Sequence, residues 1–521
     1  MHLRFLLVLL VSSFLAVPSQ AQNLETSFES SGMEEFTPHG EMAAYLTDVQ
    51  AVARDMSLGI YGESREGREL FYAVFSRSGV ETPAEAHATG KPVVLLGASA
   101  HGHNFKLRES LLIMARELGA PGAELNRLLD DVIVIMAPSK NPDGLAQGTR
   151  FTPGGADLNR DYVALNEPEM AAYVGELVNS WHPHLVLDGH DGGAQQYGGA
   201  YPYNLLYQAP ATAAADPALT RFADESIFPF LSDYLEDAGY SAFYWAYGEE
   251  DAYYGGGSGV RMGRNYGGVA NKLSVLFELA AWHDRETAIS SGSTALEAIL
   301  RFASRHADEL IGTVSEARRA TVLMGKEAEG RIPVQEQAVA DDFRVTYEIQ
   351  DPDNPDQLIR VTDAPIIKKP EATGERDRPW AYVLPPQAER AVATLQRHNI
   401  TVERLADQTT IDALRYQMGG VNFEEGANHN EGALRLAVER EVEEQAELPK
   451  GAYLVRTGQV LGRLVSHLLE PETDDNLFYW NHMTPLVPVG AWELHQQGEG
   501  GAPYLPLWKI MTPTEIPTIR L

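Results

Sequence analysis

Short apolar runs alternate with helix-like segments from residue 60 to residue 320, and this alternation constrains the fold more than any other feature. Runs typical of buried strands lie at 70–76, 92–98, 132–137, 185–187 and 274–277. Apolar residues at helical spacing occur at 105–118, 169–181 and 294–320. Strands that alternate with helices pair in parallel, because each crossover helix returns the chain to the same end of the sheet. We therefore expect an α/β fold with a mixed, mostly parallel sheet that helices cover on both faces.

The composition changes after residue 320, and this change divides the chain. Residues 351–356 (DPDNPD) favour turns, and residues 368–378 are polar and contain Pro and Gly. We expect a first domain at 22–320 and a linker or small β region at 321–379. A smaller α/β or α+β domain is predicted for 380–521, because strand-like and helix-like runs resume there. Its predicted elements are strands at 381–384 and 401–405, a helix at 387–398 and a strand-rich end at 451–480.

The charge and cysteine content exclude several classes of function. The net charge is −32, and no segment concentrates Lys or Arg. Binding to phosphate backbones requires basic patches, so nucleic acid is not an expected partner. The chain has no cysteine, which excludes disulfides, thiolate zinc sites and a cysteine nucleophile. Its chemistry must therefore use histidines, carboxylates, hydroxyls or amides.

The N-terminal segment has the pattern of a secretory signal peptide. His2 and Arg4 precede an apolar run at 5–17, and Ser19-Gln20-Ala21 has the small-x-small pattern of a cleavage site. We expect residues 1–21 to be removed and the protein to be exported, either to the periplasm or out of the cell. The alternative is an uncleaved anchor helix. No later stretch reaches the roughly 18 apolar residues that a membrane span needs, so we expect no span after signal removal.

Polar residues follow four of the predicted strands, in an order that indicates one site. His101 follows the strand at 92–98, whereas Arg150 and the Asn159-Arg160 pair follow the strand at 132–137. His190 and Glu278 follow the last two strands. Ligands of open α/β sheets bind beyond the carboxyl ends of the strands. Each residue alone has an ordinary structural explanation, but together they predict a common cleft.

This set of residues resembles the zinc carboxypeptidases of the M14 (carboxypeptidase A-like) family, over about residues 61–320. The matching segments are Gly62 to Arg68, the His101 loop, Asn141 to Gly144, Asp157 to Asp161, Asp188 to His190 and Val275 to Glu278. The resemblance implies a carboxypeptidase fold, one zinc ion and hydrolysis of C-terminal amide bonds. It also implies a peptide or peptide-like substrate with a free C-terminal carboxylate.

The resemblance further implies a role for each residue of the cleft. His101 and His190 would bind zinc, and Glu278 would be the general base. Arg150 would polarise the scissile carbonyl, while the Asn159-Arg160 pair would hold the terminal carboxylate. These roles agree with general chemistry, because zinc acidifies a water, a carboxylate moves its proton and arginine donates paired hydrogen bonds.

A tyrosine that closes over the substrate is also implied, and Tyr254 is the matching residue. The glycines at 255–257 that follow it are suitable hinge residues. The alternative is ordinary aromatic packing, since the surrounding sequence is rich in tyrosine.

The metal motif departs from the family pattern, which is His-x-x-Glu. Here it is His101-Gly102-His103-Asn104, so Asn104 stands in the third ligand position. An amide oxygen coordinates zinc more weakly than a carboxylate. The structural alternative for Asn104 is the N-cap of the helix at 105–118, and His103 is a substitute ligand if the loop is rearranged. Glu109 falls inside that helix, too far from His101 to share a metal.

Three hypotheses follow for function. The first is an exported zinc metallocarboxypeptidase with an altered metal site. The second is a non-catalytic relative that binds peptides or cell-wall fragments through the carboxylate clamp. The third is an interaction protein in which residues 380–521 matter most. Within that region we expect His467, Asp474 and Asp475 to be solvated loop residues. The sequence does not show which side chain the substrate carries.

Overall fold

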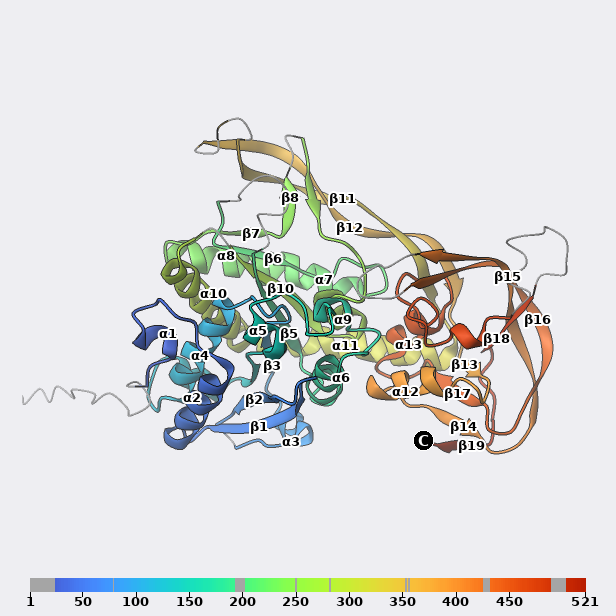
Figure 1. Ribbon diagram of the computed structural model, residues 1–521. Helices are drawn as coiled ribbons and strands as arrows, with labels where there is room; N and C mark the ends of the chain where they lie inside the picture. Colours follow the sequence, from blue (N-terminus) through green and yellow to red (C-terminus); the bar gives the residue numbers. More distant parts are fainter. Residues whose placement is uncertain are drawn as a thin grey trace, which may run out of the picture.

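The structure is a computed structural model, shown in Figure 1, that describes residues 24–77, 79–192, 202–248, 251–280, 283–351, 354, 357–424, 432–488 and 503–521. The predicted signal peptide at 1–21 lies outside these residues. None of the helices in the described ranges is both long enough and apolar enough to cross a membrane.

An eight-stranded mixed sheet forms the centre of the first unit, in the order β1-β2-β4-β3-β5-β10-β6-β7. Its strands are β1 (Met56–Glu63), β2 (Glu69–Phe75), β3 (Val93–Ala98), β4 (Ile133–Ala137), β5 (Leu185–Asp191), β6 (Leu205–Gln208), β7 (Ala242–Tyr244) and β10 (Leu273–Leu279). Strand β3 runs parallel to β4 and β5, and β10 runs parallel to β5. Strands β1, β2 and β6 join by antiparallel pairing. The predicted mixed sheet is confirmed.

Both faces of this sheet are buried, because successive side chains of a strand point to opposite faces. In β3, Val94 and Leu96 belong to one apolar cluster, while Val93 and Leu95 belong to the other. Helices that contribute to the first cluster are α2 (His39–Val52), α4 (Lys106–Gly119), α8 (Phe228–Asp237) and α10 (Arg285–Arg305). Those that contribute to the second are α6 (Pro168–Ala172), η4 (Tyr173–Asn179) and α9 (Gly263–Val269). The continuous apolar runs of the sequence are thus explained by burial on two sides.

Shorter helices connect these elements. They are α1 (Ser27–Ser30), α3 (Pro83–Ala88), η2 (Leu125–Asp130), α5 (Pro142–Gln147), η3 (Leu158–Arg160), α7 (Pro217–Phe222), η5 (Ala223–Ile227) and η6 (Thr484–Leu486).

The helical stretch predicted at 294–320 is confirmed, but a break divides it. The chain forms two helices, α10 and α11 (Ala307–Glu327), which meet at His306. The backbone of His306 leaves the helical region, with φ −114° and ψ 29°. Apolar residues keep their helical spacing on both sides of this break, so the sequence pattern does not reveal it.

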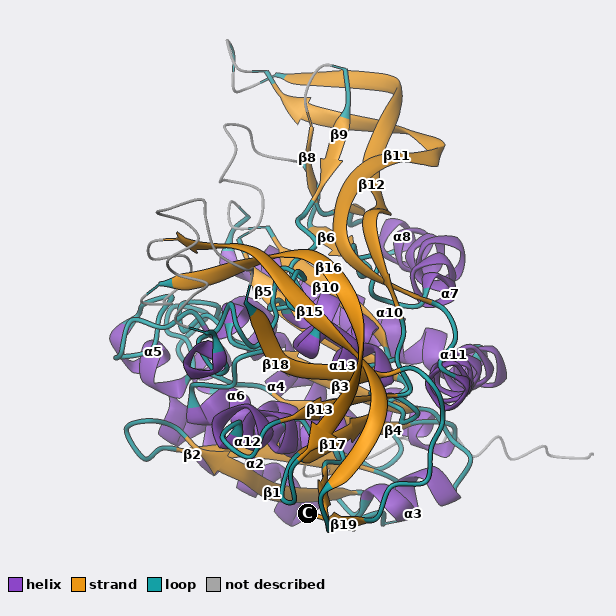
Figure 2. Ribbon diagram, turned by 90° about the vertical axis from the view of Figure 1, so that its right-hand side faces the viewer, coloured by secondary structure: helices purple, strands orange, loops and turns teal. Residues whose placement is uncertain are grey.

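A long β-ribbon follows α11, where the sequence predicts a linker or small β region. It consists of the antiparallel strands β11 (Arg331–Gln350) and β12 (Leu358–Asp377). The ribbon arches over the first unit (Figures 1 and 2). There β12 pairs with β9 (Tyr253–Gly255), which in turn pairs with β8 (Ala246–Gly248).

A second sheet of seven antiparallel strands forms the C-terminal unit, in the order β16-β15-β18-β13-β17-β14-β19. Its strands are β13 (Ala381–Leu384), β14 (Glu403–Leu405), β15 (Thr409–Glu424), β16 (Ala433–Leu448), β17 (Tyr453–Arg456), β18 (Tyr504–Ile510) and β19 (Thr518–Arg520). Helices α12 (Glu389–Arg397) and α13 (Gly462–Leu469) complete the unit. The strand-rich end predicted at 451–480 is wrong after β17, because the chain forms helix α13 there and buries Leu464, Val465 and Leu468.

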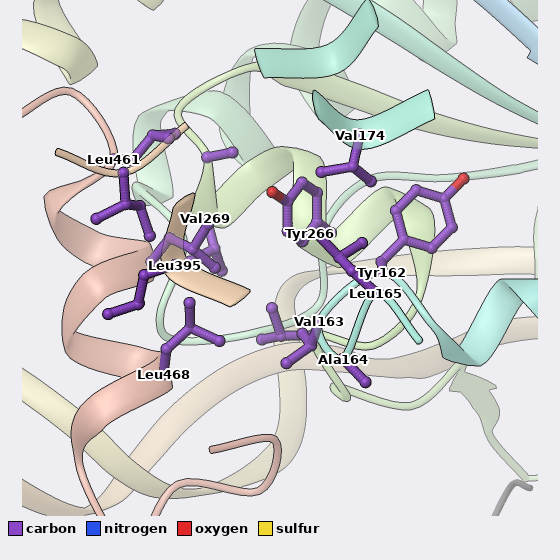
Figure 3. Close-up of a cluster of buried hydrophobic side chains, with 14 of the residues drawn as sticks. Tyr162, Val163, Ala164, Leu165, Val174, Tyr266, Val269, Leu395, Leu461 and Leu468 are labelled. Carbon is purple, nitrogen blue, oxygen red and sulfur yellow. The ribbon is translucent and has the colours of Figure 1, made fainter. Parts of the chain in front are cut away.

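The two units share a hydrophobic cluster, shown in Figure 3. Leu395 of α12 and Leu468 of α13 lie there beside Val269 of α9. A buried hydrogen bond of 2.8 Å between Tyr266 Oη and His398 Nδ1 also joins the units. The C-terminal unit is therefore packed against the first unit as part of one core.

Asp475 contributes to the same contact, and its predicted place in a solvated loop is wrong. It is fully buried and lies 2.7 Å from Arg261 Nε, just before α9. His467 is buried as well. Asp475 accepts the backbone N–H of Arg261 at 3.1 Å, so the C-terminal unit holds the chain that leads into α9.

Candidate active site

The carboxyl ends of the central strands open into a cleft of about 710 Å³. It is lined by five residues predicted for the site, His101, Arg150, Asn159, Arg160 and Glu278, together with Phe36, His103, Phe105, Lys106, Asp191, Gly192, Trp245, Met262, Arg264, Leu276, His283, Asp284 and Arg285. The structure thus brings together residues that are far apart in sequence. Glu278 and His190 lie within β10 and β5 rather than after them.

Two buried histidines face each other beside the cleft, and one of them, His101, lines it. The Nδ1 atoms of His101 and His190 are 3.3 Å apart. His101 Nε2 lies 3.2 Å from Asp157 Oδ1, and His190 Nε2 lies 3.2 Å from Asp188 Oδ2. A carboxylate at Nε2 favours the tautomer with its proton there. Both Nδ1 atoms then present lone pairs to the same point.

This arrangement fits two ligands of a zinc ion. Two nitrogens bound at about 2.0–2.1 Å in a tetrahedral site are about 3.3 Å apart. Burial lowers the pKa of His101 to about 3, although its hydrogen bond to Asp157 opposes this shift. The imidazole is therefore neutral at physiological pH, which is the form that binds a metal.

Charged groups behind the histidines fix their orientation. Asp188 accepts a hydrogen bond of 2.9 Å from the fully buried Lys140. Burial alone would raise the pKa of Asp188, but the charges of Lys140 and His190 lower it well below its usual value. Asp157 is held by a cation as well, because Arg150 Nη2 donates to its Oδ2 at 2.8 Å. The sequence motifs assign no role to these two carboxylates. One signal for Asp188 was present, because Asp188 and His190 are two residues apart in a strand and therefore lie on the same face of the sheet.

Asn104 is buried close to this pair, but not as a helix cap. The cap residue of α4 is Phe105, and the N–H groups of Lys106 and Leu107 donate to the carboxylate of Asp191. The predicted N-cap role of Asn104 is therefore wrong. Its Nδ2 donates to the carbonyl of Asp191 at 2.8 Å, while its Oδ1 is buried without a hydrogen-bond partner.

The third ligand position of the metal motif holds an amide, Asn104, in place of a carboxylate. Across the described ranges, no three His, Cys, Asp or Glu side chains gather as a metal would require. The buried Oδ1 of Asn104 has no hydrogen-bond partner, which leaves its lone pairs open to a cation. His103 is exposed, lines the cleft and stacks on His101 with ring centroids 6.0 Å apart. Glu109 is fully buried and accepts hydrogen bonds from Thr37.

Glu278 stands beside the histidines on the neighbouring strand. It pairs in register with His190 across the β10–β5 boundary and lines the cleft. Burial raises its pKa to about 7, with His190 opposing the shift and Asp191 and Asp188 adding to it. A carboxylate with a pKa near neutrality can both accept and return a proton.

The predicted arginines have different environments. Arg150 donates to Asp157 Oδ2 through Nε and Nη2, and its Nη1 lies 3.4 Å from His101 Nδ1. Arg160 donates to the carbonyl of Asn159 at 2.8 Å, and no carboxylate of the described chain lies within 4 Å of it. Asn159 accepts the N–H of Gly263 at 3.1 Å. Arg160 is thus held in place with its charge available to an anion.

Tyr254, the predicted lid residue, is not among the residues that line the cleft. It lies in β9, where pairing with Ile367 of β12 and with β8 places it in the ribbon sheet. Trp245 lines the cleft from the chain that precedes β8. The ribbon pairing that fixes Tyr254 joins segments too far apart in sequence to be inferred from local pattern.

Comparison with known proteins finds similarity to carboxypeptidases. The zinc carboxypeptidase family (Peptidase M14) matches residues 42–232. "Carboxypeptidase 2" of Trichophyton rubrum is 24% identical over 481 residues, covering 85% of this chain and 83% of the relative. "Carboxypeptidase 2" of Trichophyton tonsurans is 24% identical over 443 residues, covering 80% and 78%. A metallo-carboxypeptidase structure from Burkholderia cenocepacia has a TM-score of 0.41 at 20% identity, covering 52% of this chain and 70% of that one.

These matches are to proteins named as carboxypeptidases. They confirm the resemblance to the M14 zinc carboxypeptidases stated from the sequence, and the family model matches residues 42–232.

Proposed function

We propose that this protein is an exported zinc-dependent metallocarboxypeptidase in which Asn104 replaces an anionic metal ligand. The observation that carries the proposal is the pair of facing Nδ1 atoms of His101 and His190, each histidine oriented by its own carboxylate. His101 lines a cleft that Glu278 and Arg160 also line. The substrate is a peptide or peptide-like molecule with a free C-terminal carboxylate.

Each residue of the site has a different role in the proposed hydrolysis. His101, His190 and Asn104 would hold a zinc ion, which would supply an acidified water and polarise the carbonyl. Glu278 takes a proton from the attacking water and returns it to the leaving amine. Arg150, whose Nη1 faces His101, stabilises negative charge on the carbonyl oxygen. Asn159 and Arg160 hold the terminal carboxylate by charge-assisted hydrogen bonds.

Metal analysis of the purified protein tests this proposal. We expect about one zinc per chain, lost in His101→Ala. The second candidate is a metal-poor protein that binds peptides or cell-wall fragments without turnover, and the neutral side chain of Asn104 favours it. Wild-type protein that contains no zinc after zinc loading, yet still binds peptides with a free carboxylate, would establish that second function.

Asn104→Glu is expected to raise zinc affinity by about tenfold or more, because a carboxylate gains more from the dication than an amide does. The metal-free protein should lose about 1–3 kcal/mol of stability, since Glu loses the hydrogen bond to the carbonyl of Asp191. Competition with a zinc chelator measures the affinity. Asn104→Ala is the control and should bind zinc more weakly than wild type. Equal affinity in all three proteins would exclude Asn104 as a ligand.

Turnover is expected to fall on the acid side of neutrality. Glu278 acts as a base only when ionised, and its pKa is about 7 in the metal-free protein. A bound cation favours the ionised form, so the acid limb of kcat/KM should lie at or below pH 7. Below that limb, kcat/KM should drop about tenfold per pH unit. A profile that rises as the pH falls from 7 to 5 would contradict the assignment.

Export is a separate proposal that rests on the pattern of residues 1–21. We expect the mature protein from a cell with its own secretion system to begin at Gln22. N-terminal sequencing of protein from the periplasm or the medium tests this, and an intact Met1 terminus on exported protein would contradict cleavage.

A further inference from the structure

We propose that the cleft selects substrates whose C-terminal residue carries a second carboxylate, Asp or Glu, and that Arg264 recognises this group. The inference rests on the proposed carboxypeptidase function and adds its substrate class. Arg264 is the second residue of α9, lines the cleft and is only 4% exposed. Neither the sequence motifs nor the roles described above involve it.

The guanidinium of Arg264 has hydrogen bonds but no ion pair within the described residues, and the charges of Asp188 and Glu278 act on it only from beyond ion-pair distance. It donates from Nη2 to the carbonyl of Gly257 at 2.8 Å, and Nη1 lies 3.8 Å from the sulfur of Met262. Its buried Nε has no hydrogen-bond partner. Within the described residues no carboxylate lies within 4 Å of it. Burial lowers its pKa to about 10, so it remains a cation at neutral pH. A buried charge of this kind gains most from an anionic partner.

Arg264 is tied to the proposed carboxylate clamp. The N–H of Gly263 donates to Asn159 Oδ1 at 3.1 Å, which joins the start of α9 to the loop that carries Arg160. The two arginines are close enough that the charge of Arg160 lowers the pKa of Arg264. The cleft therefore presents two guanidinium groups without carboxylate partners in the described chain. A ligand with two carboxylates matches them.

The remaining walls fit a short acidic side chain. Trp245, Met262 and Leu276 line the cleft, and the Arg264 guanidinium carbon lies 5.7 Å from the Trp245 ring centroid. Methylene groups can pack against these apolar walls while the carboxylate reaches the guanidinium. An aliphatic terminal side chain would leave Arg264 desolvated and unpaired, and a basic one would be repelled.

Hydrolysis of matched peptides tests the proposal. Benzoyl-Ala-Glu, benzoyl-Ala-Gln and benzoyl-Ala-Leu have the same free α-carboxylate and differ at the terminal side chain. We expect kcat/KM of the zinc-loaded wild type to be at least about tenfold higher for the Glu peptide than for the Gln peptide. In Arg264→Gln this ratio should fall to about one. Arg319→Gln, which removes an exposed charge on α11 at a residue that does not line the cleft, should keep the wild-type ratio.

Equal or faster cleavage of the Gln or Leu peptide by wild type would overturn the acidic selectivity while leaving the carboxypeptidase function intact. An unchanged ratio in Arg264→Gln would show that Arg264 is a structural residue. If Arg264→Gln does not fold, the ratio of kcat/KM for the Glu and Gln peptides in wild type still decides the selectivity. Arg264→Lys, which keeps the charge, then tests the residue, and we expect its ratio to lie between one and the wild-type value.

If wild type cleaves none of the peptides, the proposed function fails, and binding then tests the inference separately. Calorimetry should show at least about tenfold tighter binding of the Glu peptide than of the Gln peptide. Equal binding of the two peptides would overturn the inference.

Discussion

Glu278→Gln is expected to reduce kcat by at least about 10², the usual contribution of a positioned general base. The two side chains have nearly the same shape, so the variant should keep the pairing of β10 with β5. The amide, however, cannot accept the proton that the carboxylate takes from water. The side chain stands in register with His190, so the loss should appear in turnover rather than in substrate affinity.

Zinc content and thermal stability of the variant distinguish loss of the base from loss of the site. Both should match wild type. Glu286→Gln, an exposed residue in the first turn of α10, serves as the matched control and should leave kcat unchanged. If Glu278→Gln turns over at the wild-type rate, the general base is another residue.

Arg160→Ala is expected to weaken binding of ligands with a free terminal carboxylate by roughly 2–4 kcal/mol, which corresponds to about 30- to 1,000-fold. The guanidinium is half-buried and held by the carbonyl of Asn159. Burial lowers its pKa without neutralising it, and the charge of Asp157 opposes the shift. An incoming carboxylate therefore meets a cation that is already positioned.

The amidated form of the same peptide is the control for this variant. It lacks the negative charge, so its binding should change little between wild type and Arg160→Ala. Equal losses for the free and amidated peptides would remove the clamp role and would favour an enzyme that does not require a free C-terminus.

The central sheet could be predicted because its strands are buried on both faces and therefore appear as continuous apolar runs, as at 93–98 and 133–137. The break between helices α10 and α11 at His306 could not be predicted, because apolar residues keep their helical spacing across it. The burial of Asp475 was also missed, since its partner Arg261 is distant in sequence and belongs to the other unit.

The candidate site was predictable to a similar extent. The residues predicted as ligands, base and clamp lie near the carboxyl ends of strands or in the loops that follow them, at positions that match a known family. The structure gathers His101, His190 and Glu278 in one place. The environment of Asn104 was not predictable, because the first N–H groups of α4 donate to Asp191 of β5, which is distant in sequence, and not to Asn104. Arg264 belongs to no motif, and the role proposed for it rests on its burial without an ion pair in the described chain and on its unpartnered Nε.

The most direct test of the account is the release of the C-terminal amino acid from a peptide with a free carboxylate, by chelator-treated protein to which zinc is returned. We expect no release from the treated protein and recovery of release as zinc approaches about one equivalent per chain. The amidated peptide should stay intact throughout. Release that persists after the chelator, or that stays absent at saturating zinc, would contradict a zinc-dependent carboxypeptidase.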